Sequence, residues 1–255
     1  MPDAVSPPPR LDVDQVYVIH VRTGAEDRAA SIERQLGARG IAFEYVLEGD
    51  RDELTPELLS RWFRGPAAAP TADTSCSFKH LAACERVVRD GHRSALVLED
   101  DIVLAPRFVG ELNRSISELK VQEGADPDFA MISLENTGLE TVAPLPPGAT
   151  LLRADHGRAA GAYWFSHGAA DRLLRRALTE RLDVPFDHFQ NRLFQAGEVQ
   201  MWWRHPAIAE QGSHNGLFNS MLAPDRAGPL RRLKWLARKS WQLGVRPLLG
   251  RTRPD

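Results

Sequence analysis

Three consecutive carboxylates interrupt an apolar stretch in the middle of this chain. The run Ala95–Leu98 leads directly into Glu99–Asp101, and the apolar run Ile102–Leu104 follows. Burying unpaired charges inside a sheet is costly, so the acids are expected where a strand leaves the sheet. In open α/β sheets, ligands bind at the carboxyl edge of the strands. The stretch therefore predicts a buried strand whose end carries a polar site.

The order of the three acids favours a metal site. Side chains alternate between the two faces of a strand, which puts Glu99 and Asp101 on one side and Asp100 on the other. Converging carboxylates suit Mg²⁺ or Mn²⁺, which commonly bridge a protein to a diphosphate. The alternative is a solvated acidic turn between two strands.

The start of the chain predicts a β-α-β unit. Residues 15–21 form an apolar, β-branched run, Ile32 and Leu36 mark the inner face of a helix that Gly40 ends, and residues 42–47 form a second strand. Such a unit implies a parallel strand pair with a right-handed crossover. Later patterns predict helices at 57–63, 77–88, 106–119, 169–178 and from 186, strands at 128–134, 150–153, 161–166 and 199–203, and a strand or extended piece at 206–216.

Length and charge exclude some classes of protein. A chain of 255 residues suffices for one large α/β domain or two small ones. The net charge of -2 gives no sign of a nucleic-acid partner. Residues 225–255 hold nine basic and two acidic residues, a balance of +7, which leaves -9 on the rest.

The cysteines and the N-terminus indicate a cytoplasmic protein. Cys76 and Cys84 stand eight residues apart on one expected helix, so they cannot form a disulfide. Residues 1–14 read as a disordered leader and lack the apolar core of a signal peptide. No window approaches the length of a membrane span.

The C-terminal segment 223–255 is a basic tail that includes an amphipathic helix. Leu230, Leu233, Ala237, Trp241 and Leu248 fall on roughly one face of a helix over residues 230–249. The other faces carry Arg231, Arg232, Lys234, Arg238 and Lys239. This pattern is typical of an interfacial helix drawn to an anionic membrane, while the alternative is a closing helix that covers the acidic body.

Several segments in this order resemble one known enzyme family. They are residues 16–21 with 26–28, 76–80, 95–101, 161–166, 185–189 and 206–211, and together they span about residues 15–220. Their order and spacing resemble glycosyltransferase family 25, the family of bacterial lipooligosaccharide galactosyltransferases. The chain differs from the usual family pattern at His20-Val21, Asp27, Ser75 and Phe78-Lys79.

The resemblance implies a fold and a reaction. It implies an α/β, GT-A-like single domain over residues 15–222, with a mixed, mostly parallel sheet flanked by helices. It also implies inverting transfer of a hexose, usually galactose from UDP-galactose, with Mn²⁺ or Mg²⁺ as cofactor. The acceptor is a glycan or a lipid-linked oligosaccharide of lipopolysaccharide synthesis, which agrees with an enzyme on the inner face of the membrane.

Glycosyl transfer requires a cation at the leaving diphosphate and a base at the acceptor hydroxyl. We assign Glu99 and Asp101 to the metal, with His214 as a third ligand from a late loop, although a loop histidine is often merely exposed. Asp100 is placed for donor hydroxyls. Asp187 matches the family's Pro-x-Asp-His segment and is the expected general base, with a helix N-cap as the alternative.

The remaining donor contacts are expected near the first strand and the third helix. His20 and Arg28 are placed for the uracil and phosphates, although an exposed helix arginine is the simpler explanation of Arg28. Lys79 and His80 are expected to start a helix whose dipole favours a phosphate, and a solvated first turn explains them equally well. The aromatic residues expected in the core are Tyr163, Trp164, Trp202 and Trp203.

Two other functions fit part of the pattern. A phosphorylation receiver domain also has paired acids after a buried strand, but about ninety residues precede the acids here and the next expected strand ends without its phosphoacceptor. A catalytically inactive module that binds a glycan or a nucleotide sugar is the second alternative. Turnover of a nucleotide sugar separates the enzyme from this module.

Overall fold

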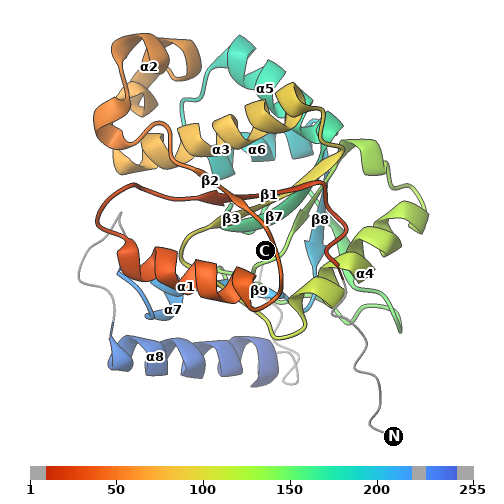
Figure 1. Cartoon of the computed structure of the whole chain (residues 1–255). Helices are drawn as coiled ribbons and strands as arrows, with labels where there is room; N and C mark the ends of the chain where they lie inside the picture. The colour runs from red at the N-terminus through yellow and green to blue at the C-terminus, as the bar shows by residue number, and fades with distance from the viewer. Residues whose placement is uncertain (1–9, 220–227, 246–255) are drawn as a thin grey trace, which may run out of the picture.

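The computed structural model describes residues 10–219 and 228–245. Most of the elements expected from the sequence are present in it (Figure 1). The strands are β1 Gln15–Ile19, β2 Glu44–Val46, β3 Ser94–Glu99, β4 Ile102–Leu104, β5 Ala130–Ser133, β6 Leu151–Ala154, β7 Ala162–Ser166, β8 Gln200–Arg204 and β9 Ala209–Gln211. The helices are α1 Glu26–Gly37, α2 Pro56–Trp62, α3 Ala72–Asp90, α4 Phe108–Val121, α5 His167–Glu180, α6 Phe186–Gln195, α7 Gly212–Asn215 and α8 Pro229–Lys239. Short 3₁₀ turns lie at Arg51–Glu53, Gly65–Ala68 and Pro127–Phe129, and a π-helical turn lies at Ser240–Val245.

One seven-stranded sheet organises the described chain. Its strand order is β2-β1-β3-β7-β5-β8-β6, and β4 pairs with β9 in a separate small sheet. Strands β2, β1, β3, β5 and β8 run in one direction, whereas β7 and β6 run in the other. The mixed, mostly parallel sheet is therefore confirmed. The parallel pairing of β1 with β2 also confirms the β-α-β unit.

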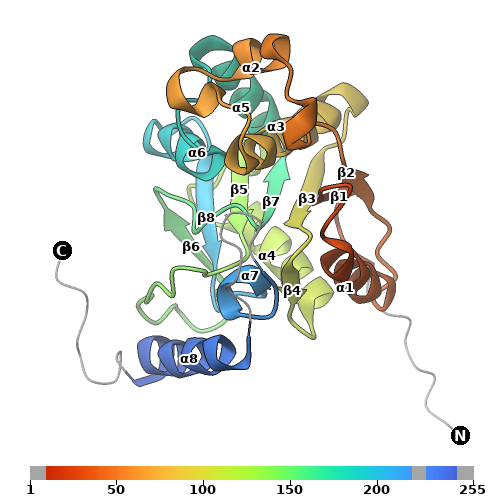
Figure 2. The ribbon, with the colours of Figure 1, turned by 90° about the vertical axis from the view of Figure 1, so that its left-hand side faces the viewer.

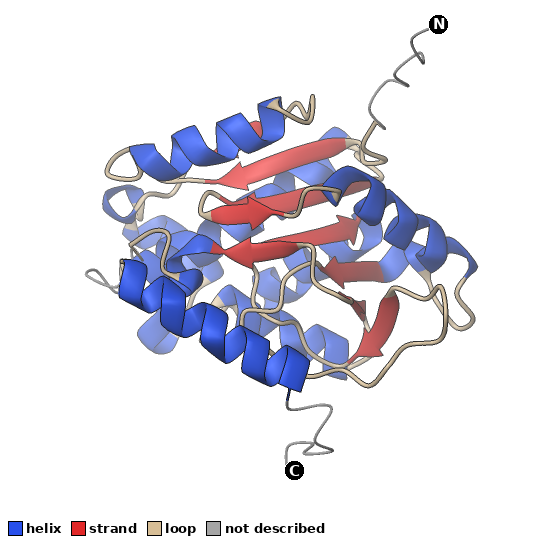
Figure 3. Ribbon diagram, turned by 90° about the horizontal axis from the view of Figure 1, so that it is seen from below, coloured by secondary structure: helices blue, strands red, loops and turns tan. Residues whose placement is uncertain are grey.

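Helices cover both faces of the sheet, and the central strands are therefore buried on both sides. On one face, Val97 and Phe165 pack with α2, α3, α5 and α6. On the other face, Leu96 and Trp164, their neighbours along the same strands, pack with α1 and α4. Figures 2 and 3 show the two helical layers with the sheet between them. The α/β fold flanked by helices is confirmed, and the four aromatic residues expected in the core are all buried.

The third helix begins earlier than expected. The Thr71 hydroxyl accepts a hydrogen bond from Thr74 N and caps α3 at Ala72. Lys79 and His80 are consequently in the interior of the helix, so the prediction that they start it is wrong. The expectation of a solvated first turn fails for the same reason, since both side chains are buried.

The two ends of the chain pack differently. Asp12 N donates to Asn113 Oδ1 and Asp14 N donates to Ser94 O, so residues 10–14 of the expected leader contact the body. Residues 1–9 and Leu248 lie outside the described residues. The expected C-terminal helix is present as α8, and it lies beside α7 at the edge of the molecule (Figures 1 and 2). No helix in the described ranges combines the length and hydropathy needed to cross a membrane.

Candidate active site

A cavity of about 750 Å³ opens at the carboxyl edge of the sheet. Strands β1 and β3 both end there, and β7 begins there, with Glu99 N donating to Gly161 O. Gly161 leaves room for two neighbouring side chains, because a Cβ at this position would meet Gln211 and Glu135 at less than 3 Å. The turn after β2, the first half of α3, the start of α6 and α7 complete the wall.

Eight of the nine residues expected in the site line this one cavity. They are His20, Arg28, Lys79, His80, Glu99, Asp100, Asp187 and His214. They come from six separate segments of the sequence, which the sheet edge and its covering helices bring together. Asp101 does not line the cavity and lies behind its wall.

Arg28 and His20 both contact the Asp100 carboxylate. Arg28 Nη2 lies 2.7 Å from Asp100 Oδ1 and 3.7 Å from Asp101 Oδ2. His20 Nδ1 lies 2.6 Å from Asp100 Oδ2. Arg28 is buried, so the simple explanation of an exposed helix arginine is wrong. Two of the five residues expected to bind the donor therefore contact the acidic turn.

Asp101 holds the loop that carries His214. Its Oδ2 accepts a hydrogen bond of 2.9 Å from Ser213 N, and its main-chain oxygen accepts one of 2.9 Å from Gly212 N. Burial and the nearby Glu99 charge raise the pKa of Asp101 to about 6, although Arg28 and Ser213 act in the opposite direction. Asp101 thus sets the position of α7 from behind the cavity wall.

Glu99 has a different set of neighbours from Asp100 and Asp101. Its Oε1 lies 3.6 Å from His80 Nε2 and 3.9 Å from Cys76 Sγ. Burial raises the pKa of Glu99, but His80, Arg28 and His214 outweigh burial, and the net direction is downward. The expected convergence of Glu99 with Asp101 by strand alternation is not observed, because β3 ends at Glu99 and the chain turns there.

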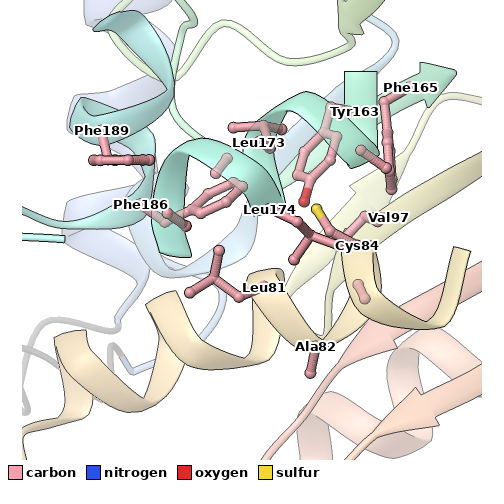
Figure 4. Close-up of a cluster of buried hydrophobic side chains, with 14 of the residues drawn as sticks. Leu81, Ala82, Cys84, Val97, Tyr163, Phe165, Leu173, Leu174, Phe186 and Phe189 are labelled. Atoms are coloured by element: carbon pink, nitrogen blue, oxygen red, sulfur yellow. The ribbon is translucent and has the colours of Figure 1, made fainter. Parts of the chain in front are cut away.

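Packing fixes the His80 ring beside Glu99. His80 Nδ1 lies 2.9 Å from the Tyr163 hydroxyl, and the ring stacks on Phe186 with 4.8 Å between centroids. Figure 4 shows the Tyr163 hydroxyl pointing toward the helix that carries Leu81 and Cys84. His80 is thus held by a strand on one side and by α6 on the other. Cys76, one turn earlier on α3, was missed as a site residue because a single cysteine carries no motif of its own.

Lys79 forms a structural ion pair at the edge of the cavity. Its side chain is 1% exposed, and Nζ lies 2.8 Å from Asp50 Oδ1 while donating to the main-chain oxygens of Leu47 and Glu48. Gly49, at φ +83°, allows this turn to lie over Phe78, which a Cβ would meet at 2.1 Å. The Lys79 ammonium group therefore already has an ion-pair partner and two hydrogen-bond acceptors within the protein.

Asp187 lies in the first turn of α6 at the cavity wall. The N-cap of this helix is Pro185, so Asp187 is not the cap, although its Oδ1 accepts a hydrogen bond of 2.9 Å from His188 N. Asp187 is half-buried and His188 is exposed. The Asp187 carboxylate is therefore within reach of a hydroxyl group that enters the cavity.

The cavity wall carries an excess of negative charge. Six carboxylates line it, from Asp50, Asp52, Asp73, Glu99, Asp100 and Asp187, against the three basic side chains of Arg28, Arg51 and Lys79. With neutral histidines, the formal excess is three negative charges. This excess of negative charge disfavours the entry of a further anion that is not accompanied by a cation.

A third buried carboxylate, after Asp100 and Asp101, lies close behind the site. Glu135 follows β5, is fully buried, and accepts hydrogen bonds from Ala162 N and the Thr137 hydroxyl. Burial raises the pKa of Glu135 to about 8, and the charges of Glu99 and Asp101 act in the same direction. Its position at a strand end was the available signal, but the sequence did not show that the side chain turns inward.

The residues proposed for a hard cation fit it only in part. Glu99 and His214 line the cavity, and Asp101 Oδ1 is buried with no hydrogen-bond partner within the described chain. Asp101, however, is turned toward the loop at Ser213, and Asp100 is occupied by Arg28 and His20. Mg²⁺ and Mn²⁺ prefer a shell rich in oxygen ligands, and of the three acids of the turn Glu99 is the one that is paired with neither Arg28 nor Ser213.

Comparison with known proteins gives structural matches at low sequence identity. No protein-family model matches the sequence, and no curated protein matches it. The chain is similar to a glycosyltransferase involved in glycosylation of the major capsid of PBCV-1, with 11% identity over 77% of this chain and 94% of that chain and a TM-score of 0.41. It is also similar to the inositol-1-phosphate CTP transferase from T. maritima, with 10% identity over 90% and 98% of the two chains and a TM-score of 0.38. A third similar structure is the mannose-1-phosphate geranyltransferase from Thermus thermophilus, with 12% identity over 79% and 77% and a TM-score of 0.37.

Proposed function

We propose that this protein is a cation-dependent glycosyltransferase that uses a nucleotide-sugar donor. The observation that carries the proposal is the convergence of eight expected site residues on one cavity at the carboxyl edge of the sheet. The negative wall supports a cation requirement, because a nucleoside diphosphate brings further negative charge into it. By resemblance to glycosyltransferase family 25, the donor is UDP-galactose and the acceptor a glycan of lipopolysaccharide synthesis.

Different residues act at the leaving diphosphate and at the hydroxyl groups of the donor. A bound divalent cation supplies positive charge at the leaving diphosphate, with Glu99 and His214 as its ligands in the cavity wall. Asp101 positions His214 through its contacts with α7. Arg28 and His20 hold Asp100 in a fixed orientation from which its oxygens accept hydrogen bonds from donor hydroxyls.

Asp187 accepts the proton of the acceptor hydroxyl. Direct displacement with inversion requires a base on the side opposite the leaving group. Asp187 belongs to α6, whereas Glu99 belongs to β3, so the base and the proposed cation ligand are held by different elements of the same wall.

The test is turnover of a nucleotide sugar by Asp187→Asn. The variant keeps the shape of the side chain but cannot accept the proton, so transfer or slow hydrolysis of UDP-galactose should fall by about 10²- to 10⁴-fold. The donor-induced rise in melting temperature should stay unchanged. The exposed Asp155→Asn serves as control and should retain parental turnover. Unchanged turnover in Asp187→Asn, or no turnover in the parent with any divalent cation, would contradict the proposal.

We also propose that α8 contacts an anionic membrane. Leu230 and Leu233 are 74% and 65% exposed, and Leu236 and Trp241 are about half exposed. The helix turns Arg231, Trp235 and Lys239 toward the body instead. Exposed basic residues flank the apolar face, and this combination matches an anionic bilayer surface in both polarity and charge.

Vesicle sedimentation tests the membrane contact. The parent should bind vesicles that contain phosphatidylglycerol and bind pure phosphatidylcholine vesicles far less. Leu230→Ser with Leu233→Ser should release the protein from the anionic vesicles. Val121→Ser, which removes an apolar side chain that is 84% exposed at the end of α4, should not. Equal binding by both variants would contradict the assignment, as would a parent that self-associates instead of binding vesicles.

A further inference from the structure

One group of side chains in the cavity has the composition of a site for a borderline metal ion. Cys76, His80 and Glu99 each offer one ligand atom, and these atoms lie within 4.8 Å of one another. Among residues 10–219 and 228–245 it is the one such group of three or more histidine, cysteine or acidic side chains. Its sulfur and nitrogen atoms distinguish it from the oxygen-rich shell of Mn²⁺ or Mg²⁺.

The three residues are brought together by a helix and a strand end. Cys76 and His80 are four residues apart on α3, so their side chains lie on the same face of the helix. Glu99 is the last residue of β3, which runs beneath this face. Both elements belong to the core, so the group does not depend on a flexible loop.

The distances between the ligand atoms fit a tetrahedral ion. Zinc bonds of about 2.0 to 2.3 Å place neighbouring ligands roughly 3.3 to 3.8 Å apart. His80 Nε2 and Glu99 Oε1 are 3.6 Å apart, and Cys76 Sγ and Glu99 Oε1 are 3.9 Å apart. These two pairs need shifts of only a few tenths of an ångström to bind one ion, while the Cys76 and His80 ligand atoms, which lie within 4.8 Å of each other, need to approach by at most about 1 Å.

One buried nitrogen of the group has no hydrogen-bond partner among the described residues. His80 is 1% exposed, and its Nε2 has no hydrogen-bond partner in the described part of the chain. Its other ring nitrogen contacts the Tyr163 hydroxyl at 2.9 Å. This is the arrangement by which a hydrogen-bonded second nitrogen orients a histidine ligand toward a metal.

We propose that Cys76, His80 and Glu99 bind a borderline divalent ion, Zn²⁺ or Co²⁺, with a fourth position open to the cavity. The open position would accept a water molecule or an anionic oxygen of a ligand. Glu99 is also a ligand of the divalent cation in the proposed reaction, so a single ion binds to this carboxylate. The present proposal concerns the identity of that ion, and it does not depend on whether the protein transfers a sugar.

Cobalt titration of the full chain tests the site without measuring activity. The protein is stripped with a chelator, kept reduced with a phosphine, and titrated with Co²⁺. We expect one Co²⁺ per chain, visible bands of a tetrahedral ion, and a near-ultraviolet charge-transfer band that requires a thiolate ligand. Zn²⁺ should displace the Co²⁺, and the same concentration of Mn²⁺ should not.

The second cysteine provides a matched control. The chain has two cysteines, and Cys84 lies on the same helix among apolar side chains (Figure 4). Cys84→Ala should keep the charge-transfer band, which then assigns the thiolate to Cys76 without changing it. Cys76→Ser should lose the band, and His80→Gln should weaken Co²⁺ binding at least tenfold. A parent without the band, a Cys84→Ala variant that loses it, or displacement by Mn²⁺ would overturn the proposal.

Discussion

The two halves of the acidic turn face different partners, although their carboxylates are adjacent in sequence. Asp100 and Asp101 share the Arg28 guanidinium, and Asp100 also contacts His20. Glu99 faces a neutral thiol and an imidazole on α3. One half of the turn is therefore paired with the Arg28 guanidinium, and Glu99 has no salt bridge to an arginine or lysine within the described residues.

The difference comes from the end of β3. The pairing of β3 with β1 continues up to Glu99, after which Asp100 N donates to Ile19 O and the chain turns. This bond carries Asp100 toward His20 and α1, while Glu99 stays on the side of α3. Carboxylates at neighbouring positions thus have different neighbours, Arg28 and His20 in one case and the side chains of α3 in the other.

The largest expected effect comes from removing the Arg28 guanidinium, which pairs with Asp100 and Asp101. Arg28→Met should lower the free energy of unfolding by about 3 to 5 kcal/mol, because Asp100 and Asp101 would stay buried without their ion pair. Urea denaturation measures this change. Arg34→Ala, on the exposed face of the same helix, should change it by less than about 1 kcal/mol. A small effect in Arg28→Met would mean that the two halves do not differ in compensation.

The next effect separates the two halves by ion binding. At a Co²⁺ concentration of 100 times Kd, the ion should stabilise the parent by about 2.7 kcal/mol, and Glu99→Gln should lose most of this stabilisation. Asp100→Asn should retain it, because Asp100 is occupied by Arg28 and His20. Thermal denaturation with and without Co²⁺ measures both variants. Equal losses in the two variants would make the acidic turn a single site.

The smallest effect concerns Glu135, a buried carboxylate whose hydrogen bonds come from neutral groups. Burial raises the pKa of Glu135 from 4.5 to about 8, so between these values the folded protein holds a proton that the unfolded chain has lost. Stability should therefore fall as pH rises through this window. Glu135→Gln cannot ionise, and its stability relative to the parent should grow by about 1.4 kcal/mol between pH 6 and pH 7. Denaturant unfolding at both pH values checks this, and a constant difference would place a cation near Glu135.

The positions of the strands and of the site were accessible from the sequence. Apolar runs and helical spacing are local signals, and they predicted the strands around the acidic turn and the helices between them. The rule that ligands bind at the carboxyl edge of a sheet predicted a polar site at the acidic turn. The other site residues were expected from the family resemblance and their local context, and eight of the nine line one cavity. The start of α3 was misjudged because its first turns carry polar residues, which become buried only when the turn after β2 and the α6 segment pack on them.

The sequence by itself determined the order of the elements, the acidic end of β3 and the amphipathic character of the tail, because these follow from residue type and spacing along the chain. Only the tertiary structure decided that Arg28 pairs with Asp100 and Asp101, that Asp101 faces α7, and that Cys76 lies beside His80 and Glu99. These choices depend on side chains far apart in sequence, such as Asp101 and Ser213, which lie 112 positions apart. Such contacts are set by burial and charge pairing in the folded state, which no local pattern records.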